Sequence, residues 1–192
     1  MQIILGSQSP RRREILSYFT IPFIQASPPF EEEAVPFQGD PEAYVCTLSN
    51  GKAESLADRF SDKVILTADT IVFQAGKVYN KPKSDEEAFQ AISELVGRWH
   101  TVYTGVTVRQ GSQTFCQAEA THVLFNALTP AQIRHYIANT EWADKAGGYA
   151  IQMAGGLIVR KIDGCYYNVM GLPINTVESL LKNFGIELWD YL

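Results

Sequence analysis

The sequence lacks the features that mark membrane-spanning, secreted and disulfide-rich proteins. No run of apolar residues approaches the roughly 20 that a membrane span requires, and the apolar stretch at residues 1–7 is too short and wrongly flanked for a signal peptide. The three cysteines, Cys46, Cys116 and Cys165, are scattered and form neither a disulfide framework nor a Cys-x-x-Cys pair. We therefore expect a cytoplasmic protein that does not bind membranes.

Motifs for zinc, nucleic acids and dinucleotides are also missing. The three histidines are not spaced as zinc ligands, and the net charge of −5 argues against a general nucleic-acid-binding protein. No Gly-x-Gly-x-x-Gly segment occurs, and Gly51-Lys52 lacks the upstream glycine and the downstream serine or threonine of a P-loop. A Rossmann dinucleotide site and a P-loop are therefore disfavoured.

The composition instead fits one globular domain. The chain has 192 residues, of which 46% are hydrophobic, and a chain of this length buries roughly 70% of its unfolded surface. No internal repeat, low-complexity tract or linker divides the sequence. We expect a single domain over residues 1–192, and an arrangement of two lobes around a cleft stays open.

Hydrophobic periodicity predicts a mixed α/β fold in which strands and helices are interspersed. Three expected helices begin at cap residues, which are Ser9, Asp40, and Ser84 with Glu87 as a capping box. A hairpin is expected within residues 156–170, where Asp-Gly separates two strand-like runs. The other expected strands are 2–7, 22–27, 63–73, 100–110 and 114–125, and the expected helices are 9–19, 40–60, 84–97, 129–139 and 173–184.

Charged residues near the N-terminus are distributed unevenly. Arg11, Arg12 and Arg13 fill the first turn of the expected helix, where the helix dipole disfavours cations. An acidic run follows at residues 31–33. Two solvated charge runs would explain the pattern. Alternatively, a helix N-terminus with guanidinium groups nearby is a strong site for phosphate.

Asp69 lies inside the apolar run at residues 64–73, where an unpaired carboxylate would be costly to bury. One interpretation is an aspartate at a strand end that caps a turn. The other is a carboxylate at the edge of a cleft, where it binds a metal ion or removes a proton from water.

Two lysines and a glycine-rich segment are the remaining candidates for function. Lys52 lies on the long helix expected at 40–60, and Lys81 lies between a hairpin and a helix. Residues 144–156 contain four glycines, and the amide of Gln152 can both donate and accept hydrogen bonds, which suits the edge of a nucleobase. Taken separately, these residues are equally explained as solubilising lysines and an ordinary loop.

Five segments occur in order along nearly the whole chain: LGSQSPRRREIL, ADTIVF, NKPKS, DKAGGYAIQ and VMGLP. Together they resemble the Maf family of nucleoside triphosphate pyrophosphatases. The resemblance implies the mixed α/β fold of inosine triphosphatase-like (Maf/Ham1) enzymes, with a twisted mixed sheet flanked by helices and a central cleft. It also implies hydrolysis of a nucleoside triphosphate to the monophosphate and pyrophosphate with a divalent cation, Mg²⁺ or Mn²⁺.

The resemblance assigns roles to particular residues. Glu32 and Asp69 are implied at the metal ion and the attacking water, and Lys52 and Lys81 at the phosphates. Ser7 is placed near the phosphates too. Successive helical residues differ by about 100°, so three consecutive arginines cannot all face one ligand. The substrate-binding arginines are therefore expected to be the two in the family motif, Arg11 and Arg12, with Arg13 peripheral.

Substrate preference follows from a finer resemblance. Arg11, Thr70 and Gln152 match the branch of the family associated with dTTP and UTP, whereas another branch prefers 7-methyl-GTP. Uracil and thymine present two carbonyls around one N–H, which a glutamine amide can pair with. An enzyme of this kind would remove these nucleotides from the pool, and the family's older association with septum formation suggests a link to cell division.

The sequence also departs from the family pattern and leaves alternatives open. A non-catalytic nucleotide-binding regulator of septum formation, a 7-methyl-GTP-type pyrophosphatase and a phosphatase that removes the terminal phosphate are the rival functions. A homodimer stays open, as do the preferred metal and any cell-division partner. The departures are Thr47-Leu48-Ser49 in place of Arg-Leu-Ala, together with Gly51, Asn80 and Met153.

Overall fold

The structure is a computed structural model that describes residues 2–192, and the chain divides into two compact units. The first unit comprises the chain up to Asp69, Thr104–Glu119 and Gly171–Leu192; the second comprises Thr70–Tyr103 and Ala120–Met170. No helix within residues 2–192 combines the length and the hydrophobicity needed to cross a membrane.

The strands form a mixed sheet with the hydrogen-bonded order β2-β1-β3-β5-β6-β7, and β4 pairs with β3. Strand β1 is parallel to β2 and to β3, whereas the β3–β4 and β6–β7 pairs are antiparallel. The predicted mixed α/β class is therefore confirmed. The strands within the described residues are β1 (Ile3–Gly6), β2 (Phe23–Ala26), β3 (Val64–Gln74), β4 (Lys77–Tyr79), β5 (Trp99–Gln110), β6 (Gln113–Phe125) and β7 (Val159–Asp163).

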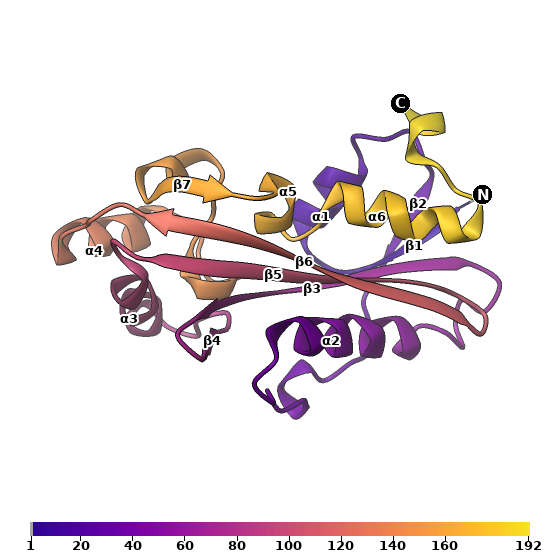
Figure 1. Ribbon diagram of the computed structural model, residues 1–192, viewed down its shortest axis with the longest axis horizontal. Coiled ribbons are helices and arrows are strands. Elements are labelled where there is room, and N and C mark those ends of the chain that lie inside the picture. Colours follow the sequence, from indigo (N-terminus) through magenta and orange to yellow (C-terminus); the bar gives the residue numbers. More distant parts are fainter. Residues whose placement is uncertain (1) are drawn as a thin grey trace. The chain divides into compact units, whose positions relative to one another are not determined.

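Helices connect the parallel strands of the first unit. Figure 1 shows α2 below the strands of this unit and α1 and α6 above them. A parallel connection requires such a crossover, because the chain must return to the edge at which the previous strand began. The connecting helices are α1 (Pro10–Leu16) and α2 (Pro41–Ser55), whereas α6 (Ile174–Leu181) follows the last strand of the chain.

The predicted caps of α1 and α2 are confirmed. The Ser9 side chain accepts a hydrogen bond from the Arg12 amide at 3.4 Å, and Asp40 Oδ1 accepts from the amides of Glu42 and Ala43 at 3.0 and 3.1 Å. Each cap satisfies amides that have no partner within the helix. Both helices end earlier than the apolar pattern suggests, at Leu16 and Ser55 instead of near 19 and 60.

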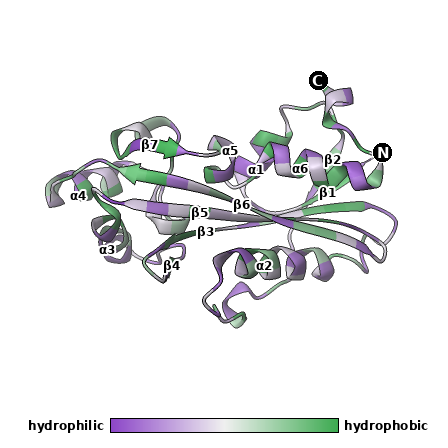
Figure 2. Cartoon of the chain, in the orientation of Figure 1, coloured by the Kyte–Doolittle hydropathy of each residue, from purple (hydrophilic) through white to green (hydrophobic). Residues whose placement is uncertain are grey.

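Apolar side chains from β1, β2 and β3, and from α2 and the residues just after it, form a core cluster in the first unit. Strand β1 is coloured as hydrophobic in Figure 2, as expected for a parallel strand buried on both faces. The members of the cluster are Ile4, Ala26, Ala53, Leu56 and Ile65, with Phe60 packed against them.

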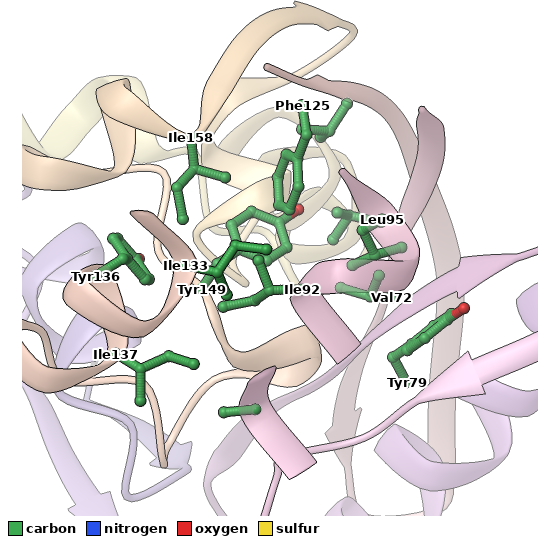
Figure 3. Packing of buried hydrophobic residues seen from close by; sticks show 13 residues of the cluster. Val72, Tyr79, Ile92, Leu95, Phe125, Ile133, Tyr136, Ile137, Tyr149 and Ile158 are labelled. Carbon is green, nitrogen blue, oxygen red and sulfur yellow. The ribbon is translucent and has the colours of Figure 1, made fainter. Parts of the chain in front are cut away.

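The second unit has its own core, built between α3 (Asp85–Leu95), α4 (Pro130–Asn139) and the strand segments of this unit. Tyr149 and Phe125 lie at its centre (Figure 3), with ring centroids 4.6 Å apart and an edge-to-face geometry. At the start of α3, the Ser84 hydroxyl accepts from the Glu87 amide at 3.2 Å, while the Glu87 carboxylate accepts from the Lys83 amide. One of the two hydrogen bonds of the predicted capping box is therefore present, and the Glu87 side chain bonds to the amide of Lys83 instead of that of Ser84.

The prediction of a hairpin around Asp163-Gly164 is wrong. Strand β7 ends at Asp163, and the following residues form the short helix α5 (Tyr166–Val169) instead of a returning strand. The buried Asn168 side chain donates to the Val102 carbonyl at 3.0 Å and to the Thr121 hydroxyl at 2.9 Å. These contacts from distant strands outweigh the local turn preference of Asp-Gly.

Candidate active site

Helix α2 packs closely on the sheet of the first unit. A Cβ atom at Gly105 of β5 would lie 2.4 Å from the backbone of Val45, so only glycine permits this approach. Buried hydrogen bonds reinforce the contact: Thr67 Oγ1 donates to the Ser49 carbonyl at 2.8 Å, and the Ser49 and Thr107 hydroxyls lie 2.8 Å apart. These contacts fix the position of α2 along the sheet, and therefore that of Lys52 one turn later.

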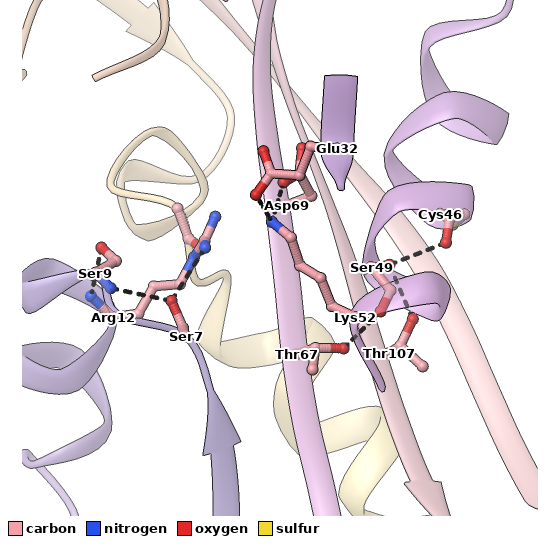
Figure 4. Close-up of polar contacts among 11 residues, drawn as sticks. Ser7, Ser9, Arg12, Glu32, Cys46, Ser49, Lys52, Thr67, Asp69 and Thr107 are labelled. Atoms are coloured by element: carbon pink, nitrogen blue, oxygen red, sulfur yellow. Dashed lines mark hydrogen bonds and ion pairs between the residues drawn. The ribbon is translucent and has the colours of Figure 1, made fainter. Parts of the chain in front are cut away.

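Lys52 lies between two carboxylates (Figure 4). Its ammonium group donates to Asp69 Oδ1 and lies 2.8 Å from Glu32 Oε1. Lys52 and Asp69 are buried, whereas the Glu32 side chain is 42% exposed. Because a buried charge is tolerated when it is paired, the lysine explains how Asp69 can lie within an apolar strand.

Arg12 lies on α1 near the same carboxylates. Its Nε donates to the Gly171 carbonyl at 2.7 Å and Nη1 to the Ser7 hydroxyl at 3.3 Å. Burial lowers the pKa of the Arg12 guanidinium from its ordinary value, Asp69 and Glu32 raise it, and Arg11 lowers it. The first unit therefore gathers Ser7, Arg11, Arg12, Glu32, Lys52 and Asp69, and leaves Arg13 exposed.

The acidic side chains of this cluster are the candidate ligands for a divalent cation. Within residues 2–192, no group of three or more histidine, cysteine, aspartate or glutamate side chains is arranged to hold a metal ion. Glu32 and Asp69, however, both contact the same lysine nitrogen. Carboxylate oxygens suit Mg²⁺ and Mn²⁺, and Mg²⁺ in nucleotide enzymes is bound by one or two carboxylates together with substrate phosphates. The two carboxylates therefore fit a cation that is shared with a phosphate group.

The other predicted site residues belong to the second unit. Thr70 follows Asp69 on β3, and Lys81 is exposed between β4 and α3. Gln152 is half-buried and precedes the 3₁₀ helix η3 (Met153–Leu157). Met153 has φ 52°, in the left-handed region that favours glycine.

Tyr44 is a site neighbour that the sequence did not reveal. It is half-buried on α2, and its hydroxyl donates to the Val35 carbonyl at 3.3 Å. Burial raises the pKa of the Tyr44 hydroxyl, and Asp69 and Glu32 raise it further. Its apolar helical spacing hid this position, because a tyrosine on such a face packs like any aromatic residue.

The fold and the charged cluster define a mixed α/β protein with a site suited to a polyphosphate. The Maf-like protein family matches residues 2–184, and the chain belongs to this family. It is 50% identical over 192 residues to the dTTP/UTP pyrophosphatase of Chlamydia caviae, covering 100% of this chain and 98% of the relative. The dTTP/UTP pyrophosphatase of Clostridium perfringens is 44% identical over 191 residues, covering 98% and 100%.

A solved structure supports the fold. The Ham1 protein of Staphylococcus aureus has a TM-score of 0.55 with 12% sequence identity, covering 96% of this chain and 100% of that chain. The expected fold, shared with Ham1-type proteins, is therefore confirmed.

Proposed function

We propose that this chain hydrolyses nucleoside triphosphates, with dTTP and UTP as substrates, to the nucleoside monophosphate and pyrophosphate. The full-length relatives named dTTP/UTP pyrophosphatase support the reaction and the choice of bases. The observation that carries the proposal is the pairing of Lys52 with Glu32 and Asp69 beside Arg12, because it combines cations for phosphate oxygens with carboxylates for water.

The chemistry follows from these charges. Water attacks the α-phosphorus, the bond from this phosphorus to the bridging oxygen breaks, and pyrophosphate leaves. Arg12 and Lys52 stabilise negative charge on the phosphate oxygens, because both are cations held in place before the substrate arrives. Asp69 accepts the proton of the attacking water. A Mg²⁺ or Mn²⁺ ion held by Glu32 and Asp69 would neutralise further phosphate charge.

We further propose, from the family resemblance, that Ser7 and Arg11 contact the phosphates and that Lys81, Thr70 and Gln152 act on the substrate too. Lys81 supplies another cation for the phosphates, and Thr70 and Gln152 bind the nucleotide, with Gln152 selecting its base. Such an enzyme would act in nucleotide metabolism by clearing dTTP and UTP from the pool.

The test is a panel of nucleoside triphosphates with Mg²⁺ or Mn²⁺, in which monophosphate, diphosphate, phosphate and pyrophosphate are separated. We expect monophosphate and pyrophosphate in equal amounts, with dTTP and UTP turned over fastest. Diphosphate with orthophosphate as the main products would instead identify a phosphatase. Tight binding without turnover would identify a nucleotide-binding regulator.

The Asp69→Asn variant tests the mechanism. The substitution nearly preserves shape but removes the proton acceptor, so kcat should fall on the order of 10²-fold or more. Asp62→Asn is the matched control, because Asp62 is exposed and paired only with its neighbour Lys63 among the ion pairs seen. A folded Asp69→Asn enzyme with most of its activity would show that Asp69 is structural.

A further inference from the structure

The acidic segment that carries Glu32, residues 30–37, contacts α2 through its first residue, Phe30. The Phe30 ring covers Gly51, the residue before Lys52: a Cβ atom at Gly51 would lie 2.3 Å from Phe30 Cε2 and 2.4 Å from Cζ. Real Cβ atoms do not approach so closely, so the ring occupies the space that any other residue at position 51 would fill.

The same segment contacts α2 again beyond Glu32. Tyr44 donates to the Val35 carbonyl at 3.3 Å, and the rings of Phe37 and Tyr44 meet edge to face with centroids 5.4 Å apart. Residues 30–37 are therefore attached to α2 at both ends, near Gly51 and near Tyr44.

Glu32 lies between these two attachments. The short 3₁₀ helix η1 (Glu32–Ala34) has no side-chain cap, and its backbone bond from the Val35 amide to the Glu32 carbonyl measures 3.2 Å. Of the three glutamates, Glu32 is half-buried and contacts Lys52, while Glu31 and Glu33 are exposed. The selection of Glu32 thus depends on how the segment is held against α2.

We propose that Phe30 and Gly51 are positioning residues that hold Glu32 on Lys52. The expected effect on kinetics rests on the proposed function, but the placement of Glu32 on Lys52 by Phe30 and Gly51 does not. A glycine inside a helix costs about 1 kcal/mol relative to alanine. Gly51 lies within α2 and has an ordinary helical backbone. The position therefore requires glycine because Phe30 needs the space of the missing side chain, and not because the backbone needs the flexibility of glycine.

The first test measures Lys52 without any substrate. The Lys52 side chain is only 8% exposed and Glu32 lies over its ammonium group. In Gly51→Ala, the new methyl group displaces Phe30 and with it Glu32, so acylation of Lys52 by an amine-reactive reagent, followed by mass spectrometry, should become severalfold faster. Thermal unfolding should show little net change, since the preference of alanine for the helix offsets the lost Phe30 contact.

A second residue makes the test specific. Phe30→Leu in the Gly51→Ala background removes the clash, so the double variant should return Lys52 acylation close to the wild-type rate. Glu54→Ala, on an exposed position of the same helix, is the control and should change nothing. The proposal would be overturned if Lys52 were acylated at the wild-type rate in Gly51→Ala, or at the same rate in Gly51→Ala and in the double variant.

The kinetic arm separates this inference from the proposed function. Gly51→Ala should lower kcat/KM for dTTP by about 10- to 100-fold, the range that a misplacement of about 1 Å produces, and should weaken Mn²⁺ binding measured by electron paramagnetic resonance without nucleotide. The double variant should recover both. If the wild-type protein released no pyrophosphate from dTTP, the proposed function would be wrong. The acylation of Lys52 would still test whether Phe30 and Gly51 position Glu32. Unchanged kcat/KM and Mn²⁺ affinity in Gly51→Ala would contradict the positioning alone.

Discussion

At the scale of residues, Lys52 and Asp69 depend on each other. Both are buried and each compensates the charge of the other. Removing one partner of a buried pair typically costs 3–5 kcal/mol, about what an uncompensated buried charge costs. Glu32 is more exposed, so its contact with Lys52 stabilises the fold less and is freer to be exchanged for a phosphate or a cation.

His100 predicts how stability responds to pH. It is buried, its Nε2 lies 2.8 Å from the Tyr149 hydroxyl, and burial lowers its pKa to about 4. Between pH 4 and the ordinary value of 6.5, the unfolded chain binds the proton more readily. The free energy of unfolding should therefore fall as the pH drops through this window, by at most about 3 kcal/mol.

Chemical denaturation at several pH values checks this prediction. In His100→Gln, which keeps a polar group beside Tyr149 but does not titrate, the decline between pH 6.5 and 4 should be shallower than in the wild type. His135→Gln, on an exposed position of α4, should retain the wild-type slope. Identical slopes in all three proteins would mean that His100 binds its proton equally well in the folded and unfolded chains, so that burial does not lower its pKa.

Single residues in the site were predictable to different degrees. Asp69 stood out because an unpaired carboxylate is costly to bury in an apolar run. Arg12 stood out because of the motif around it, whereas the role of Lys52 came from the family resemblance alone. The lysine that pairs with Asp69, and the choice of Glu32 from three glutamates, could not be derived from residue types. Both depend on contacts between α2, β3 and the segment 30–37, which are distant in sequence.

At the scale of elements, the contact between α2 and β5 predicts a stability effect. A methyl group added at Gly105 would meet the backbone of Val45, which cannot move aside as a flexible side chain could. Gly105→Ala should therefore lower the free energy of unfolding by about 1–3 kcal/mol, the usual cost of overpacking.

Denaturant unfolding measures the effect against a matched glycine. At Gly156 an added Cβ meets nothing within 4 Å, so Gly156→Ala should change the unfolding free energy by less than about 0.5 kcal/mol. Equal stability of Gly105→Ala and wild type would show that α2 does not pack so closely on β5.

Elements were predictable where local signals agree with packing. Strands β1 and β3 and the starts of α1 and α2 follow from apolar runs and caps. The second half of the Asp163-Gly164 hairpin failed because Asn168 bonds to Val102 and Thr121, contacts that local propensity cannot reveal. Strand β4 was not among the expected strands, since its three residues are too few to show an alternation of apolar and polar side chains.

At the scale of the whole molecule, substrate choice is the remaining prediction. If Gln152 reads the base, Gln152→Glu should change the ranking of kcat/KM among dTTP, UTP, CTP and 7-methyl-GTP, because a wrong base leaves buried polar groups unpaired. Gln132→Glu, on the exposed first turn of α4, is a control for the charge change. Equal preference in the wild type, or an unmoved ranking in Gln152→Glu, would assign Gln152 to holding its loop.

The two compact units are interleaved along the gene. The chain passes from one unit to the other at Asp69/Thr70 within β3, at Tyr103/Thr104 within β5 and at Glu119/Ala120 within β6, and it returns to the first unit at Met170/Gly171. No single crossover between two related genes can therefore exchange one unit and keep the other intact. A chimaera joined within β5 or β6 at these points should inherit a mixture of both parents in each unit, whereas one joined at Asp69/Thr70 should be mixed in the first unit alone.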